Sequence, residues 1–192
     1  MKRVMIDLET LSTFPNAAVI AIGVVIRDDS SLSHKQARSW FIDRDRVIGH
    51  EDQATIDWWN AQDPRVRNQV FGGHQHPHEV LVELNGFLRS NGITPERTDD
   101  VRCYASPAMF DFPILRHQYQ QLEIIPAWSW RTERCLSTMM KEIKDHFGIE
   151  IRDVHPELKH HPVHDCLSQF RELDACFEEL SLRNNIARNS LR

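Results

Sequence analysis

Short apolar runs near the start of the chain predict three consecutive β-strands. The runs cover residues 3–8, 17–27 and 38–42, are rich in β-branched and aromatic residues, and are separated by polar segments typical of turns. Strands that follow one another through short turns usually pair in an antiparallel manner. The beginning of the chain therefore predicts an antiparallel meander of three strands.

Further along the chain, apolar residues recur at helical spacing instead. Two short helices are expected over residues 55–62 and 65–71, and the second has Asp63 as its cap and Pro64 at its first position. A longer helix is expected over residues 77–90, where apolar residues recur at intervals of three and four. The middle of the chain is thus predicted to be helical.

The second half of the chain mixes strand and helix patterns. We expect a strand over 101–105, a helix over 113–121, an irregular or strand-like stretch over 124–130, a helix over 136–146, a polar loop over 153–162 and a final helix over 163–182. This order predicts an α/β fold with a mixed, five-stranded sheet that is flanked by helices, in which the stretch over 124–130 is the candidate fifth strand.

The composition predicts a soluble, single-domain protein. Nothing divides the chain, so we expect one domain over residues 1–182 and a polar tail over residues 183–192. No apolar run reaches the roughly 20 residues that span a membrane, and no signal peptide precedes the first strand. The four cysteines form no Cys-x-x-Cys pair, which argues against a zinc ribbon and fits reduced thiols. We therefore expect a cytoplasmic protein without a membrane partner.

Asp7 and Glu9 are the first candidates for chemistry. They lie one residue apart at the end of the first predicted strand, so their side chains point to the same face. Two neighbouring carboxylates at the edge of an apolar core repel unless a cation holds them, which suggests a divalent metal site. Because 28 of the 192 residues are acidic, however, such a pair also arises by chance at a solvated strand end.

Three further residues lie at comparable junctions. Asp111 precedes the helix expected from Pro113, Asp165 lies in the first turn of the final helix, and His160 precedes Asp165 with four residues between them. Each has a simpler explanation, because Asp111 could cap its helix, Asp165 could favour the positive end of a helix dipole, and His160 could belong to a solvated loop. A mixed sheet of this order could bring all of these ends together.

The ordered set of Asp7-x-Glu9-Thr10, Asp111 and His160-x-x-x-x-Asp165 resembles the DEDDh 3′–5′ exonuclease family, which has a ribonuclease-H-like fold. The resemblance covers about residues 1–180. Three flanking strings are similar to the branch of phage exodeoxyribonuclease A, exodeoxyribonuclease VIII and small bacterial exoribonucleases. They read IDWWNAQ at 56–62, FDFPIL at 110–115 and HDC at 164–166.

The resemblance implies a site for two Mg²⁺ or Mn²⁺ ions. Asp7 would bridge both ions, Glu9 and Asp165 would complete the site of the nucleophilic water, and Asp111 would hold the second ion. His160 would act as the general base, and a near-neutral pKa suits that task. Without metal, the four carboxylates should repel, so we predict that at least one has a raised pKa.

The register of the proposed base is open to one alternative. His161 is adjacent to His160, and the small residue usual two positions after the family's histidine is replaced by Pro162. The four-residue spacing to Asp165 favours His160, and His161 is the alternative base.

Several residues near the acidic motifs are candidates for binding the nucleic acid. Trp58 and Trp59 are adjacent, so one should face the core and the other the rim of the cleft. Basic residues could contact phosphates, although scattered arginines are usually solvated surface: Arg65, Arg67, Arg131, Arg134 and Lys159. Four residues that flank the acidic motifs could wedge or stack terminal bases, with ordinary packing as the alternative: Leu11, Phe14, Met109 and Phe110. Thr10 and Trp59 are further candidates for substrate binding.

The sequence leaves the substrate and the assembly open. A metal-dependent 3′–5′ exonuclease that acts on single-stranded ends is favoured, with DNA slightly ahead of RNA because of the phage-like strings. The alternatives are an exoribonuclease on RNA or short oligoribonucleotides, a non-catalytic nucleic-acid-binding module of the same fold, and an unrelated metal-binding protein. The net charge of −5 requires metal or a local basic patch to neutralise a polyanion. Related enzymes are often dimers, so a homodimer is also considered.

Overall fold

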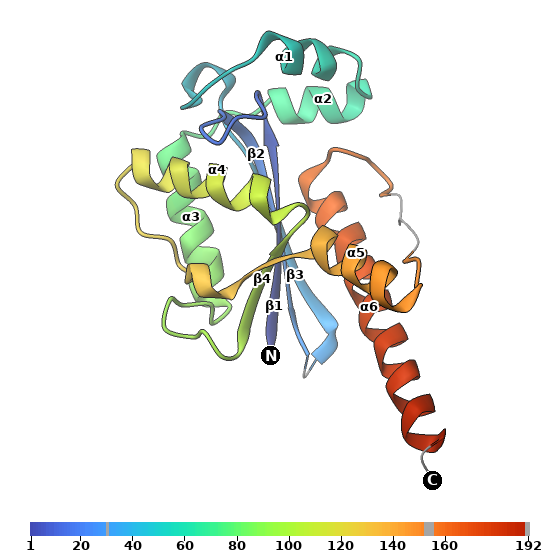
Figure 1. Cartoon of the computed structure of the whole chain (residues 1–192). Helices are drawn as coiled ribbons and strands as arrows, with labels where there is room; N and C mark the ends of the chain where they lie inside the picture. The colour runs from blue at the N-terminus through green and yellow to red at the C-terminus, as the bar shows by residue number, and fades with distance from the viewer. Residues whose placement is uncertain (30, 152–155, 191–192) are drawn as a thin grey trace.

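A computed structural model describes residues 1–29, 31–151 and 156–190, and the side chains of 1–29, 36–151 and 156–183. Its centre is one mixed sheet (Figure 1). The strands follow the spatial order β3-β2-β1-β4-β5 and comprise β1 (Lys2–Thr10), β2 (Val19–Asp28), β3 (Ser31–Phe41), β4 (Val101–Ala105) and β5 (Glu133–Cys135).

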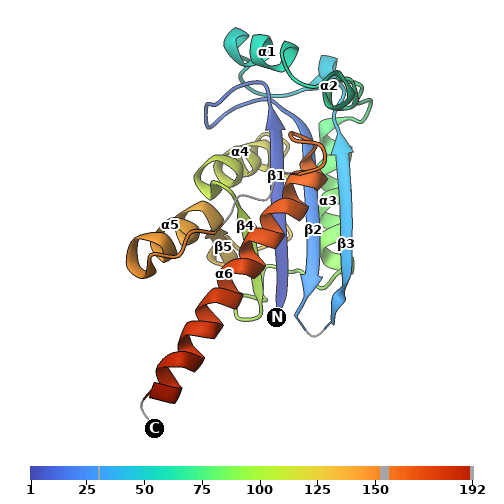
Figure 2. The ribbon, with the colours of Figure 1, turned by 90° about the vertical axis from the view of Figure 1, so that its right-hand side faces the viewer.

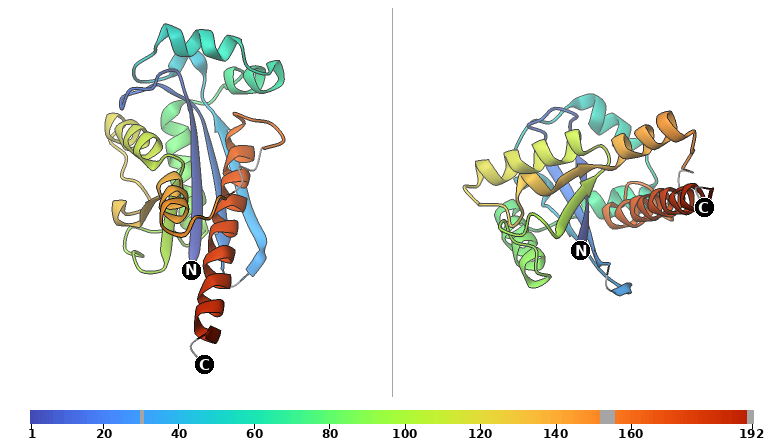
Figure 3. Two further views of the ribbon diagram at one scale, coloured as in Figure 1. Left: turned by 45° about the vertical axis from the view of Figure 1, so that its right-hand side comes forward. Right: turned by 60° about the horizontal axis from the view of Figure 1, so that its bottom comes forward.

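The strand pairing confirms the predicted fold class. β1 pairs with β2 and β2 with β3 in an antiparallel manner, whereas β1 pairs with β4 and β4 with β5 in parallel. The chain therefore opens with the expected meander and continues into a mixed, five-stranded α/β sheet. Figures 2 and 3 show α3 and α6 on opposite faces of this sheet.

Six α-helices surround the sheet in the described part of the chain. α1 and α2 lie beyond the ends of β1 and β2, at the top of Figure 1, and α5 packs against α6 through Ile143 and Cys176. No described helix combines the length and apolar character that crossing a membrane requires. The bounds are α1 (Gln53–Asn60), α2 (Pro64–Phe71), α3 (Pro77–Ser90), α4 (Ala108–Gln121), α5 (Leu136–Phe147) and α6 (Pro162–Ser190).

The fifth strand differs from the sequence prediction. The stretch over 124–130 is not a strand, and β5 lies a few residues later at Glu133–Cys135. A strand that pairs over only three residues is too short to show alternation, so its pattern could not identify it. β3 also begins earlier than expected, at Ser31 instead of residue 38.

Two helix boundaries also differ. α4 begins at Ala108 and not at Pro113, so Asp111 lies within the helix and does not precede it. The helix tolerates Pro113 because the φ of proline is helical. Pro113 has no N–H to donate to the carbonyl oxygen of Met109, four residues earlier, and Met109 is 82% exposed to water. α6 continues to Ser190 instead of ending at residue 182, because no proline or glycine interrupts residues 183–190. Of the loop predicted over 153–162, residues 153–155 lie outside the described residues and residues 156–161 are non-helical.

The alternation of side chains along β1 divides the core into two layers. Ile6 and Leu8 pack with α3 and α4 on one face of the sheet. Met5 packs with α5 and α6 on the other face. Because strand side chains alternate, Asp7 and Glu9 share the face of Met5 and point toward α6.

Candidate active site

A close approach between β2 and α6 brings the beginning of α6 to the acidic end of β1. A Cβ atom at Gly23 would lie 2.3 Å from the backbone carbon and oxygen of Pro162, the first residue of α6. The Cys166 thiol, one turn into the helix, is buried 3.5 Å from the carbonyl oxygen of Met5 and 3.4 Å from that of Gly23. Glycine at position 23 therefore lets the helix rest on the sheet.

Asp165 and His160 enter the site from this junction. The backbone N–H of His160 donates to Oδ2 of Asp165 at 2.8 Å, and His160 has a φ of 66°. One ligand atom each of Glu9, His160 and Asp165 lie within 4.8 Å of one another. Two carboxylates and one imidazole from distant parts of the chain thus meet on the α6 side of β1.

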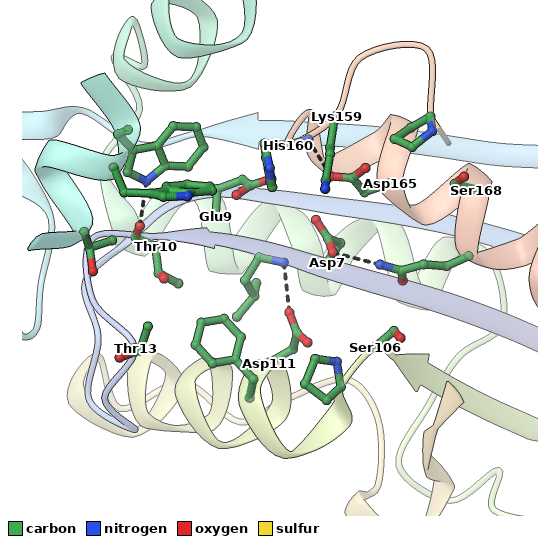
Figure 4. A pocket seen from close by; sticks show the side chains of 18 of the residues that line it. Asp7, Glu9, Thr10, Thr13, Ser106, Asp111, Lys159, His160, Asp165 and Ser168 are labelled. Carbon is green, nitrogen blue, oxygen red and sulfur yellow. Dashed lines mark hydrogen bonds between the residues drawn. The ribbon is translucent and has the colours of Figure 1, made fainter. Parts of the chain in front are cut away.

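Asp111 reaches the same space from α4. β1 pairs with β4 only as far as Met5, so the edge of β1 beyond that residue is not occupied by β4. The backbone N–H of Leu8 donates across this edge to Oδ1 of Asp111 at 3.1 Å, and Asp111 is buried. Figure 4 shows Asp7, Glu9, Asp111 and Asp165 around one space between β1, α4 and α6. The structure therefore brings together the four acidic residues and His160.

Burial is the largest cause of a raised pKa at each of the four carboxyl groups. It raises the pKa of Asp111 to about 7 and that of Asp165 to about 6. The pKa values of Asp7 and Glu9 are raised well above their ordinary values, and repulsion among the carboxylates adds to the effect of burial. This confirms the prediction of at least one raised carboxylate pKa, and it means that a nearby positive charge would favour the ionised form of these groups.

The cluster opens into a cavity of about 700 Å³, a size suited to a nucleotide-sized ligand. Trp58 is 43% exposed and lies edge-on to the His160 ring with a centroid distance of 4.7 Å. Trp59 is buried, and its indole N–H donates to the carbonyl oxygen of Thr10 at 2.9 Å. Both tryptophans line the cavity, but Trp59 is buried in the core and Trp58 is exposed at the rim, as the sequence predicted.

The residues predicted to bind the substrate divide into three groups. Thr10, Trp59 and Phe110 line the cavity. Leu11 is fully buried in the cluster under α1 and α2, so the expectation that it wedges a base does not fit this structure. Phe14 and Met109 are exposed and do not line the cavity.

Of the basic candidates, Lys159 lines the cavity, next to His160 and Asp165 (Figure 4). Gln169 was not among the residues predicted from the sequence, although its side chain contacts Asp7 and also lines the cavity. Its position four residues after Asp165, and so on the same face of α6, was the available signal.

The donor set suits hard divalent cations. Carboxylate oxygens are the ligands that Mg²⁺ and Mn²⁺ prefer, and four of them meet in a buried pocket where their charges repel. The group of Glu9, His160 and Asp165 has ligand atoms close enough to share one ion. Asp7 and Asp111 line the same cavity, so their carboxylates can supply further oxygen ligands.

This fold and this ordered set of acidic residues define the class of ribonuclease-H-like, DEDDh-type 3′–5′ exonucleases. A family model described as the 3′–5′ exoribonuclease Rv2179c-like domain matches residues 2–177, so the chain belongs to that family. The predicted exonuclease superfamily is thereby confirmed, whereas the phage branch stays a prediction. The chain has no significant match among curated proteins.

Solved structures of nucleases share the fold at low sequence identity. Cell-death related nuclease 4 (CRN-4) aligns with a TM-score of 0.68 and 14% identity over 93% of this chain and 64% of its own. E. coli exonuclease I in complex with a dT13 oligonucleotide aligns with a TM-score of 0.66 and 12% identity over 99% of this chain and 43% of its own. The nuclease domain of 3′hExo, a DEDDh family member bound to rAMP, aligns with a TM-score of 0.60 and 11% identity over 93% of this chain and 92% of its own.

The chain therefore spans less than two thirds of CRN-4 and less than half of exonuclease I, and nearly all of the 3′hExo nuclease domain. Because the identities are low, these likenesses establish the ribonuclease-H-like fold and nothing finer.

Proposed function

We propose that this protein is a metal-dependent 3′–5′ exonuclease that removes nucleoside monophosphates from the 3′ ends of single-stranded nucleic acid. The observation that carries the proposal is the meeting of Asp7, Glu9, Asp111, Asp165 and His160 in one cavity. A non-catalytic binding module would not need a full set of buried, mutually repelling carboxylates, which lowers stability unless it serves a purpose.

His160 would accept the proton of the attacking water. Burial, with a smaller effect from Lys159, lowers the pKa of His160 below the ordinary histidine value, which favours the neutral imidazole that can accept a proton. The water oxygen forms a bond to phosphorus and the bond from phosphorus to the 3′ oxygen of the preceding nucleotide breaks. The products are a nucleoside 5′-monophosphate and a strand shortened by one nucleotide with a free 3′ hydroxyl group.

Asp7, Glu9, Asp111 and Asp165 are the residues that would hold two Mg²⁺ or Mn²⁺ ions. When bound, such ions stabilise the negative charge that develops on the attacking and leaving oxygens. The hydrogen bond from the Leu8 N–H fixes one oxygen of Asp111, and that from the His160 N–H fixes one oxygen of Asp165. Each carboxylate therefore keeps its second oxygen for a ligand.

The rest of the cavity offers contacts for a single strand. The exposed face of Trp58 can stack on a base, an interaction that tolerates any base because each has a π-face. Lys159 supplies a positive charge beside the carboxylates that can contact a phosphate group. Trp58 replaces Leu11, Phe14 and Met109 as the leading candidate for base stacking.

Both polymers are candidate substrates. The phage-like sequence strings favour DNA, whereas the description of the matched family names exoribonuclease activity and so favours RNA. The structure of exonuclease I was solved with a dT13 oligonucleotide, and that of 3′hExo with rAMP. The four cysteines carry free thiols, which agrees with the proposed cytoplasmic location.

A gel assay tests the activity and the polymer together. Single-stranded DNA and RNA of matched sequence, each labelled at the 5′ end, would be incubated with the protein and Mn²⁺, and with the Asp7→Asn variant. The proposal predicts a ladder that shortens from the 3′ end on at least one polymer and that is absent for Asp7→Asn. An intact substrate with both polymers, or an identical ladder for the variant, would reject it.

A further inference from the structure

Gln169 contacts the metal-binding cluster without belonging to it. It lies on α6 one turn after Asp165 and lines the cavity, and its side-chain Nε2 donates to Oδ1 of Asp7 at 3.0 Å. This hydrogen bond joins residues 162 positions apart in the sequence and connects α6 to the acidic end of β1. Asp7 is thus held by a neutral donor from the same helix that carries Asp165.

The orientation of the Gln169 amide follows from its partner. The ionised carboxylate that a metal ion would bind only accepts hydrogen bonds, and in the structure the amide nitrogen of Gln169 accordingly faces Asp7. The Oε1 atom of Gln169 is then left buried, with no hydrogen-bond partner among the described residues. A buried carbonyl without a partner lowers stability, because it loses its hydrogen bonds to water. The Gln169 amide therefore holds the Asp7 carboxylate in place, while its unpaired Oε1 atom lowers the stability of the folded protein.

We propose that Gln169 is a positioning residue that fixes the carboxylate of Asp7 for divalent metal binding. This inference rests on the proposed function. Lysine or arginine at position 169 could also hold Asp7, but its positive charge would compete with a metal ion for the carboxylate. A glutamine fixes Oδ1 by a neutral hydrogen bond and leaves the charge of Asp7 and its Oδ2 atom to the ion. Partners of this kind orient the ligands of metal sites.

Gln118 is a structural counterpart within the same protein. It is buried on α4, and its Nε2 donates at 2.9 Å to the carbonyl oxygens of Ala17 and Ile48, and none of these three residues lines the cavity. Replacing either glutamine removes a buried amide and should lower thermal stability. Only Gln169 contacts a proposed metal ligand, so only its replacement should change metal affinity.

Calorimetric titration of Mn²⁺ into the full chain, without nucleic acid, separates the two roles. The proteins compared would be the wild type, Gln169→Met, Gln169→Ala, Gln118→Leu and Asp7→Asn. We expect Gln169→Met to weaken Mn²⁺ binding about 10- to 100-fold, and Gln118→Leu to keep the wild-type affinity with a lower melting temperature. Gln169→Ala provides the same comparison if the methionine variant does not fold.

The outcomes distinguish this inference from the proposed function. If the wild type binds Mn²⁺ and Asp7→Asn does not, but both Gln169 variants bind as the wild type does, the positioning role is wrong and the metal site stands. If the wild type binds no Mn²⁺, both proposals fail. In the nuclease assay, Gln169→Met should lower kcat and leave KM for the oligonucleotide unchanged. A higher KM with unchanged Mn²⁺ affinity would assign Gln169 to substrate contact and overturn the proposal.

Discussion

At the scale of single residues, two adjacent histidines have different surroundings. The His160 ring lies against Trp58 and has a nitrogen within 4.8 Å of ligand atoms of Glu9 and Asp165. The His161 ring is buried, with centroid distances of 6.0 Å to Phe41 and 4.6 Å to His164. The four-residue spacing to Asp165 selected the histidine that faces the cavity, and its role as the base stays a prediction.

Replacement of each histidine tests that role. Removal of a general base usually lowers the rate by about 10²- to 10⁴-fold. We expect His160→Ala to show such a loss in kcat, and His161→Ala to lower the melting temperature while retaining most of the activity per folded molecule. The measurement is single-turnover hydrolysis of a labelled oligonucleotide. Full activity of His160→Ala together with loss in His161→Ala would assign the base to His161.

Trp58 is the residue from which we expect the largest effect on substrate binding. Loss of one base–aromatic stack costs about 1–3 kcal/mol, which corresponds to roughly a 5- to 150-fold rise in KM. Trp58→Ala should therefore raise KM for single-stranded oligonucleotides. Trp130→Ala is the matched control, because Trp130 is exposed and does not line the cavity. Equal KM values for the two variants would exclude stacking by Trp58.

The raised carboxylate pKa values predict how stability depends on pH. A carboxyl group with a raised pKa in the folded state stabilises the protein while protonated, and this contribution is lost as pH rises through that pKa. The pKa of Asp111 is about 7. The loss begins near the ordinary aspartate pKa of 3.8 and ends just above pH 7, so the melting temperature of the metal-free protein should still fall between pH 6.5 and pH 8. Histidines titrate in the same range, and the comparison with Asp111→Asn removes their contribution.

Added Mg²⁺ should reverse this trend, because deprotonated carboxylates bind the ion better at higher pH. Asp111→Asn is the control and should flatten the pH dependence of the metal-free protein. The measurement is thermal unfolding with and without Mg²⁺ across the window. A metal-free protein that becomes more stable as pH rises from 6.5 to 8 would contradict the account.

At the scale of elements, the structure explains which predictions succeeded. β1 and β2 are long and apolar, so their existence and pairing could be predicted from the sequence. β5 pairs over only three residues, so the pattern of apolar residues could not identify it. α4 contains Pro113, so the helix was predicted to begin at that proline instead of at Ala108. The acidic pair on β1 was readable because strand side chains alternate. The contact between Gln169 and Asp7 was not, since it depends on how α6 crosses the sheet.

The crossing of α6 over β2 depends on Gly23. A Cβ at this position would lie 2.3 Å from the Pro162 backbone, so Gly23→Ala must displace the start of α6. Overpacking of this kind typically costs about 1–3 kcal/mol. We expect a lower melting temperature, weaker Mn²⁺ binding and reduced activity, because Asp165 and His160 follow the helix. The measurements are thermal unfolding and Mn²⁺ titration.

Gly86→Ala is the matched control for this prediction. Gly86 lies within α3, and nothing is within 4 Å of a Cβ added there. Alanine in a helix interior is more favourable than glycine by about 1 kcal/mol, so this variant should be slightly more stable and fully active. Unchanged Mn²⁺ affinity in Gly23→Ala would show that the close approach does not position the site.

At the scale of the whole molecule, the site is an assembly of distant segments. β1 supplies Asp7 and Glu9, α4 supplies Asp111, and α6 with its preceding loop supplies Asp165 and His160. The order of these motifs along the chain was enough to suggest the family, because motif order can be compared without knowing how far apart the residues lie in space. The edge of β1 that receives Asp111 and the exposure of Trp58 depend on tertiary packing, and so only the structure could supply them.

The net charge of −5 limits how the whole molecule can bind a nucleic acid. An acidic protein does not attract a polyanion over its whole surface, so binding must depend on the cavity itself. Divalent ions on the carboxylates, with Lys159 beside them, would convert the cavity from repulsive to attractive for a phosphate group. Metal dependence is therefore the property on which the account depends.

The most direct measurement identifies the first product of the reaction. A single-stranded oligonucleotide whose 3′-terminal nucleotide carries a stable isotope would be incubated with the protein and Mn²⁺, and the products separated and weighed by mass spectrometry. The account predicts that the labelled nucleoside 5′-monophosphate appears first, that it requires Mn²⁺, and that Asp7→Asn does not form it. Release from the 5′ end, internal fragments, or undiminished product without metal would contradict the account.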